Sequence, residues 1–162
     1  MSSIVVADAG PLHYLVLIDG ADILGKLFDR VLIPVAVRDE LRHGSAPSKV
    51  QAWINSPKPW LSVETVPHPQ LISGLHQGEA EALQLALQTK AAGVLMDDLD
   101  GRAAARQLGL TVIGTLGLLE RAAEKGLVEL PQAVARLRAT SFFVSEELLE
   151  AALERDRQRR QP

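Results

Sequence analysis

Three aspartates stand directly after short apolar runs of the kind that form buried strands. Asp8 follows the run from Ile4 to Ala7. Asp97 and Asp98 follow the run from Val94 to Met96. Because open α/β sheets bind ligands outside the carboxyl ends of their strands, we expect these carboxylates to meet at one rim of a sheet. The alternative role for each of them is to cap the helix that follows, which aspartate does well.

A group of carboxylates at one rim needs protons or a cation nearby. Two ionised carboxylates about 4 Å apart repel each other by roughly 4 kcal/mol at an effective dielectric constant of 20. A hard divalent ion removes that repulsion. The chain has no cysteine, so such an ion must be held by oxygen or imidazole. Of the neighbouring pair, we expect Asp97 to cap the next helix and Asp98 to serve the ion.

Three glutamates lie on predicted helices that can reach the same rim. Glu40 lies within residues 34–42, and Glu79 and Glu81 lie in the first turn of the helix that leads to Asp97. A glutamate in a first turn is favoured by the helix dipole alone, which accounts for Glu79. Glu79 and Glu81 project to different sides of the helix, so only one of them should reach the rim. Taken alone, Glu40 fits a solvated surface position better than a ligand position.

The elements that position these acids alternate along the chain. Short apolar runs separated by helical segments are typical of a parallel sheet with crossover helices. We predict buried strands at residues 4–7, 31–33, 94–96 and 111–113, and a strand at an edge or in an insertion at 61–66. We predict helices at residues 11–18, 21–28, 34–42, 48–54, 78–91, 100–108, 115–125, 131–138 and 145–160. Gly109 and Gly126 suit helix ends.

Length and composition predict one ordinary globular domain over residues 1–162. Its 162 residues are 47% hydrophobic and 23% charged, with a loop-rich excursion at 43–69 and a C-terminal helix and tail at 145–162. The net charge of −3 gives no general attraction for nucleic acid, so any such binding would need a local basic patch. The N-terminus does not resemble a secretory signal and no apolar stretch is long enough to span a bilayer, so we expect a cytoplasmic protein.

Other conspicuous side chains fit structural roles better than chemical ones. Trp53 and Trp60 can stack on bases, but in a proline-rich segment they suit core or interface packing better. The basic C-terminal tail suits a frayed helix end. The four histidines show neither i, i+4 pairing nor an acidic partner at motif spacing, which argues against a zinc site. We interpret them as surface or packing residues: His13, His43, His68 and His76.

The order of the motifs DAGPL, IPVAVRDEL, GEAEAL, MDD and GTLGLL resembles the PIN-domain family, and in particular a PIN-like branch related to toxin-type ribonucleases. The resemblance spans residues 4–149. It implies a three-layer α/β fold with a central parallel sheet flanked by helices. It also implies an acidic pocket that binds Mg²⁺ or Mn²⁺. Many members are ribonucleases, including toxins of toxin–antitoxin pairs.

Carried over residue by residue, the resemblance assigns four catalytic and metal-binding acids: Asp8, Glu40, Glu81 and Asp98. The spacing to Asp98 favours Glu81 over Glu79, which stays with Asp97 as a further candidate ligand. A glutamate stands here where the family often has aspartate. Ala9 stands where a small hydroxyl residue often follows the first acid. The glutamate leaves the second metal position open.

The resemblance implies a metal-dependent endoribonuclease that hydrolyses RNA phosphodiesters, with Arg38, Arg102 and Arg106 as candidate contacts to RNA phosphates. An antitoxin-like protein and a second copy of the chain are the expected protein partners. One alternative is a PIN-like domain without catalysis that serves in binding or assembly. Another is a receiver-like phosphoacceptor, which would need a lysine after a late strand where this chain has Gly114 and Thr115.

Overall fold

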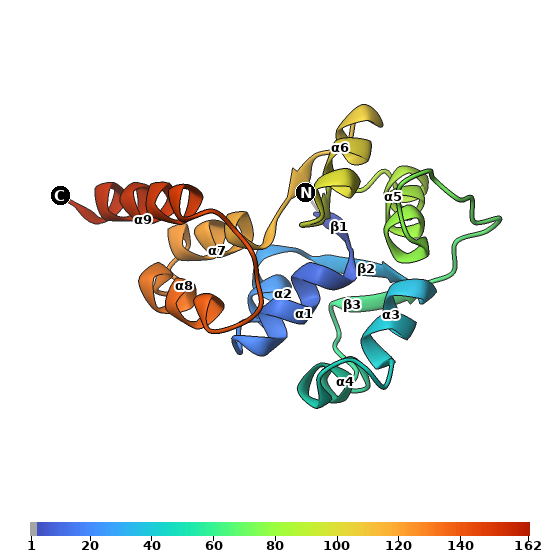
Figure 1. Ribbon diagram of the computed structural model, residues 1–162, viewed down its shortest axis with the longest axis horizontal. Helices are drawn as coiled ribbons and strands as arrows, with labels where there is room; N and C mark the ends of the chain where they lie inside the picture. Colours follow the sequence, from blue (N-terminus) through green and yellow to red (C-terminus); the bar gives the residue numbers. More distant parts are fainter. Residues whose placement is uncertain (1–2) are drawn as a thin grey trace.

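Five short strands form one parallel sheet in the computed structural model of the chain (Figure 1), which describes residues 3–162. The strands are β1 (Ile4–Ala7), β2 (Arg30–Pro34), β3 (Leu61–Glu64), β4 (Gly93–Leu95) and β5 (Val112–Ile113). Their order across the sheet is β3-β2-β1-β4-β5, and every pairing is parallel. β1 therefore lies at the centre, with β2 on one side and β4 on the other. The strand expected at an edge is the edge strand β3.

Both faces of the sheet are buried beneath helices. Neighbouring residues of a strand point to opposite faces, so they enter different cores. On β1, Val5 packs into one apolar core and Val6 into the other. β2 repeats this alternation with Ile33 and Leu32. The strands are therefore apolar without interruption, as the sequence pattern predicted.

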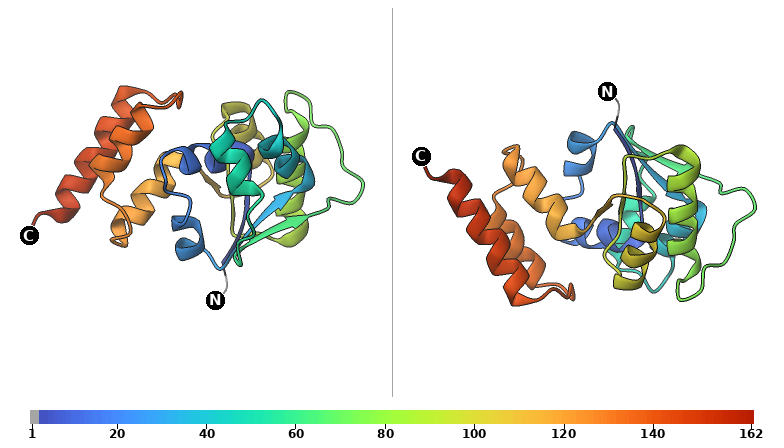
Figure 2. Two further views of the ribbon diagram at one scale, coloured as in Figure 1. Left: turned by 90° about the horizontal axis from the view of Figure 1, so that it is seen from below. Right: turned by 90° about the horizontal axis from the view of Figure 1, so that it is seen from above.

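Helices cover the two faces unequally. α5 (Gln77–Thr89) and α6 (Leu99–Gln107) supply the core on one face. The other core is supplied by α1 (Ala9–Leu17), α2 (Ile23–Leu27), α3 (Val35–Arg42), α4 (Ser48–Ile54), α7 (Thr115–Glu124), α8 (Leu130–Arg138) and α9 (Glu146–Arg160). Figure 2 shows α8 and α9 packed beside α7, away from the sheet. The predicted three-layer α/β fold is confirmed.

Most predicted helices match the structure to within two residues at each end. Gly109 and Gly126 follow α6 and α7 with φ of 77° and 72°, the left-handed conformation that glycine adopts at helix ends. The helix expected at 21–28 is shorter, because the N–H groups of Ile23 and Leu24 bond to carbonyls three residues earlier. No helix within residues 3–162 is long and apolar enough to cross a membrane.

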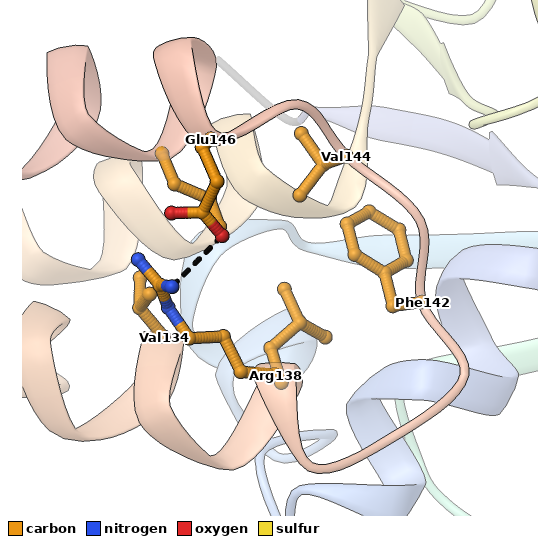
Figure 3. Close-up of a pocket in the computed structure, with 7 residues that line it drawn as sticks. Val134, Arg138, Phe142, Val144 and Glu146 are labelled. Atoms are coloured by element: carbon orange, nitrogen blue, oxygen red, sulfur yellow. Dashed lines mark hydrogen bonds and ion pairs between the residues drawn. The ribbon is translucent and has the colours of Figure 1, made fainter.

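A pocket of about 330 Å³ lies between α8 and α9 (Figure 3). Apolar residues line it together with Arg138 and Glu146, and the Arg138 guanidinium donates across it to Glu146 Oε1 at 2.8 Å. Phe143, in the connecting loop, is 93% exposed. None of the predicted site acids lines this pocket. Asp8 and Asp98 lie instead at the carboxyl ends of β1 and β4.

Candidate metal centre

Asp8 occupies the single-residue junction between β1 and α1. Its backbone N–H donates to the Leu95 carbonyl at 2.9 Å, which keeps β1 and β4 paired up to the acid. Although Asp8 stands at the N-cap position of α1, its side chain makes no capping hydrogen bond. The side chain is directed elsewhere, and the alternative role as a helix cap does not account for it.

The Asp8 carboxylate is buried and lacks a full set of hydrogen bonds. The residue is 5% exposed, and Oδ1 has no hydrogen-bond partner. Burial raises the pKa of Asp8 to about 6, with further repulsion from Glu40 and Asp97, against the lowering effect of the Ala9 N–H. A buried polar atom without a partner is rare in native proteins and calls for a specific explanation.

The start of α5 brings His76 and Glu79 to this carboxylate. The two residues form a capping box, in which the His76 N–H donates to Glu79 Oε1 at 3.2 Å and the Glu79 N–H donates to His76 Nδ1 at 3.4 Å. This reciprocal pairing turns both side chains back over the helix start. One donor atom from each of Asp8, His76 and Glu79 lies within 4.8 Å of the other two.

Asp98 joins this cluster through Glu79. Its side chain accepts the Gly101 N–H at 2.9 Å at the start of α6, and this bond is the main reason why the pKa of Asp98 is lowered. Burial, together with a hydrogen bond with Asp98, raises the pKa of Glu79 to about 7. Two carboxyls that interact in this way favour one shared proton. A cation is the natural replacement for that proton.

Asp97 has a different function from the capping role predicted for it. It is Asp98 that caps α6, whereas Asp97 accepts the Thr115 N–H at 2.7 Å and the Thr115 hydroxyl at 2.6 Å. The prediction that Asp97 caps this helix is therefore wrong, because its side chain turns towards the start of α7. Burial raises the pKa of Asp97 despite these two bonds. Asp97 ties β4 to α7 beside the cluster.

Glu40 lies at the open side of the cluster. It stands on α3, its side chain is about half exposed, and Oε1 is 3.8 Å from His76 Nδ1. A Cβ atom on Gly78 would come within 2.9 Å of the same oxygen, so the absence of a side chain there lets Glu40 approach α5. Glu40 is thus near the buried acids while remaining in contact with solvent.

Glu81 is not among the three residues whose ligand atoms converge. It is 6% exposed, and Oε2 accepts a hydrogen bond from Gln77 at 2.7 Å. It lines a groove of about 800 Å³ between α3 and α5, whose walls also include Glu40 and His76. The structure brings Glu79, rather than Glu81, to Asp8 and Asp98. This geometry does not support the preference for Glu81, because side chains two residues apart on a helix point to different faces.

Comparison with known proteins gives these groups a context. The family model of the PIN domain matches residues 4–158. The chain belongs to the PIN-domain family. PIN domains are generally nucleases that use divalent metal ions. Comparison with the curated proteins found no match.

The fold of this PIN domain is shared with a solved structure. It is similar to a PilT N-terminus domain protein from the hyperthermophilic archaeon Sulfolobus solfataricus P2, with a TM-score of 0.55 and 21% sequence identity. The match covers 74% of this chain and 92% of the archaeal one. This likeness concerns the fold.

The donor set of the PIN domain fits a divalent cation. Carboxylate oxygens suit hard ions, and the unpartnered Asp8 Oδ1 is a buried ligand atom with no other function in the structure. Asp8, Glu79 and Asp98 can hold such an ion, with Glu40 at the rim and His76 within the cluster. Sequence reasoning placed His76 among surface or packing residues. The signal that could have found it is its place three residues before Glu79, the spacing of a capping box.

The three candidate RNA-binding arginines of the PIN domain have unequal surroundings. Arg102 is half-buried on α6 and its guanidinium donates to the Met96 carbonyl at 3.0 Å, at the end of β4. Arg106 is exposed one turn further along the same helix. Arg38 is on α3 and pairs with Asp39. Only Arg102 is held against the rim of the sheet.

Proposed function

We propose that this PIN domain is a divalent-metal-dependent endoribonuclease that hydrolyses RNA phosphodiesters. The observation that carries the proposal is the buried Asp8 carboxylate, which has one unpartnered oxygen and lies beside Glu79 and His76 at the carboxyl end of β1. Membership of a family that is generally nucleolytic gives the direction. Mg²⁺ and Mn²⁺ are the expected ions.

In this proposal, the exposure of each acid decides whether it binds the metal or transfers a proton. Asp8, Glu79 and Asp98 hold the metal, since the first two are buried and Asp98 shares a hydrogen bond with Glu79. When bound, the divalent ion polarises the attacking water and offsets the charge that develops on the phosphate. Glu40 is half exposed and can take the proton of that water, because it is in contact with both solvent and the cluster.

RNA reaches the acids against their own negative charge, so local cations must hold its phosphates. Arg102 is the first candidate, because its bond to the Met96 carbonyl fixes it at the rim of the sheet. Arg106 and Arg38 extend the positive charge on either side of the rim. In this proposal, phosphate contacts position the RNA without selecting its sequence.

The test is cleavage of a single-stranded and a structured RNA with Mn²⁺ or Mg²⁺. Asp8→Asn should lower the rate by at least about 100-fold, as expected when a group that acts in the transition state is lost. Asp100→Asn is the matched control, because Asp100 is exposed on the same rim and outside the cluster. Equal rates for Asp8→Asn and the parent protein, or activity that persists in EDTA, would contradict the proposal.

A narrower form of the proposal is that the enzyme is the toxin of a toxin–antitoxin pair, held by a small antitoxin-like protein and assembled as a homodimer. Its production alone should then arrest growth, and production of Asp8→Asn should not. Arrest by both proteins would instead support a catalytically silent binding module. Light scattering of the purified protein measures its oligomeric state.

A further inference from the structure

His76 is the one imidazole in the acid cluster, and both of its ring nitrogens face carboxylates. Nε2 lies 3.1 Å from Glu79 Oε1 on the inner side. Nδ1 lies 3.8 Å from Glu40 Oε1 on the outer side. The ring is about half exposed, and the carboxylates on its two sides orient it.

The ring also reaches the buried acid. One of its nitrogens lies within 4.8 Å of ligand atoms of both Asp8 and Glu79. Asp8 Oδ1 is buried and has no hydrogen-bond partner. A surface histidine that only caps α5 would not need this arrangement, because the capping hydrogen bond uses Nδ1 alone.

We propose that His76 is a nitrogen ligand of the metal centre and makes it select a divalent transition-metal ion over Mg²⁺. The inference rests on the metal centre of the proposed function and deepens it. Mg²⁺ keeps an oxygen shell and loses its waters reluctantly, whereas imidazole is a favourable ligand for transition-metal ions. A mixed set of carboxylates and one imidazole therefore separates ions that carboxylates alone would bind similarly.

Glu40 acts on this ligand as a positioning residue. Metal-binding histidines almost always donate their other ring N–H to a carboxylate, a carbonyl or water, which fixes the tautomer. The Nδ1 atom of His76 faces Glu40 Oε1, which suits that role. If Nε2 bound the ion, Nδ1 would carry the ring proton and could donate it to Glu40 in place of accepting the long bond from the Glu79 N–H.

The experiment measures metal binding directly on the full chain, with Mn²⁺ and Mg²⁺ as probes. His76→Asn removes the imidazole while asparagine, a strong N-cap residue, preserves the start of α5. We expect Mn²⁺ affinity to fall by roughly 10- to 100-fold, the range for a perturbed metal shell, and Mg²⁺ affinity to fall much less. Pulsed electron paramagnetic resonance of bound Mn²⁺ should show coupling to a nitrogen nucleus that His76→Asn abolishes.

Two further variants separate the possible outcomes. His43→Asn removes another histidine of the neighbouring groove and should leave the nitrogen coupling intact. Glu40→Gln should weaken Mn²⁺ binding but retain that coupling, as expected of a positioning residue. Persistence of the coupling in His76→Asn, or equal losses of Mn²⁺ and Mg²⁺ affinity, would overturn the role of His76.

The proposed function can fail separately from this inference. A protein that binds Mn²⁺ through His76 but does not cleave RNA would overturn the ribonuclease and retain the nitrogen ligand. A protein that cleaves RNA with equal preference for the two ions, before and after His76→Asn, would retain the ribonuclease and overturn the selectivity. Loss of binding of both ions in Asp8→Asn locates the ion at the cluster.

Discussion

The Asp8 carboxylate is held in a position that weakens the fold and suits the chemistry. It is buried, one of its oxygens has no partner, and other acids surround it. Such groups destabilise a protein unless they bind a proton or a cation. Strain of this kind collects at functional sites, where stability and activity make opposite demands.

Asp8→Asn should stabilise the metal-free protein at neutral and higher pH. The pKa of Asp8 rises from 3.8 to about 6 on folding, so the folded state binds more protons than the unfolded state between these pH values. Its contribution to the free energy of unfolding therefore falls as pH rises through this window, and the penalty is complete above it. At pH 8 in EDTA, Asp8→Asn should be more stable than the parent protein by on the order of 1–3 kcal/mol.

Urea denaturation at pH 4 and pH 8 measures this difference. The difference should have largely disappeared at pH 4, where Asp8 is protonated in the folded state and about half protonated in the unfolded chain. A variant that is less stable than the parent at pH 8 would show that the buried carboxylate is satisfied in a way that the hydrogen-bond geometry does not reveal.

The second residue-scale prediction separates the two glutamates of α5. Glu79→Gln should reduce RNA cleavage by at least about 100-fold, because it removes a charged ligand beside Asp8 and Asp98. Glu81→Gln should have a much smaller effect, since Glu81 bonds to Gln77 and is not among the residues whose ligand atoms converge. Initial cleavage rates of the two variants decide the matter, and a larger loss for Glu81→Gln would restore the family-based assignment.

At the scale of elements, the start of α7 is tied to the end of β4 by a single side chain. Asp97 accepts two hydrogen bonds from Thr115, which is fully buried. Gly114 lies close by, since a Cβ there would come within 3.1 Å of Asp97 Oδ1. This connection holds the motif GTLGLL against the MDD motif and keeps the acid rim rigid.

Thr115→Val tests this connection. It removes the hydroxyl donor and leaves a half-buried carboxylate with the backbone N–H alone, which should lower the free energy of unfolding by about 1.5–3 kcal/mol. Thr115→Ser retains the hydroxyl and is the matched control. Thermal denaturation of both variants measures the difference, and equal losses would show that the methyl group of Thr115 matters more than the hydrogen bond.

Across the whole molecule, the acid rim brings together distant parts of the chain, so the proposed ion would couple binding to folding. The cluster draws its residues from α3, α5 and the ends of β1 and β4, which are separate in the chain and meet only in the folded state. An ion bound there stabilises the folded state but not the unfolded chain. The pocket between α8 and α9 lies outside this coupling.

Metal addition should therefore raise the melting temperature. Mn²⁺ at about 100 times its dissociation constant contributes about 2.7 kcal/mol, which corresponds to a rise of roughly 5–10 °C for a chain of this size. Differential scanning calorimetry with Mn²⁺ and with EDTA measures the rise. Asp8→Asn should show none of it, and an equal rise in that variant would place the ion elsewhere.

The sequence by itself determined the strands, most helices and the position of two acids. Asp8 and Asp98 follow parallel strands, and parallel strands bring their carboxyl ends to one rim whatever the details of packing. Apolar runs buried on both faces are also a local signal, since every residue of such a strand must be apolar. These features depend on periodicity and strand direction, which the order of residues contains.

Only the tertiary structure decided which side chains complete the cluster. Glu79 and Glu81 are the same residue type in the same part of α5. The capping box at His76 sets where α5 begins and turns Glu79 towards Asp8. Asp97 and Asp98 are adjacent, and the position of Thr115 decides their roles. Side-chain direction within one helical turn depends on the rotation of that helix against the sheet, which long-range packing sets and a local pattern does not contain.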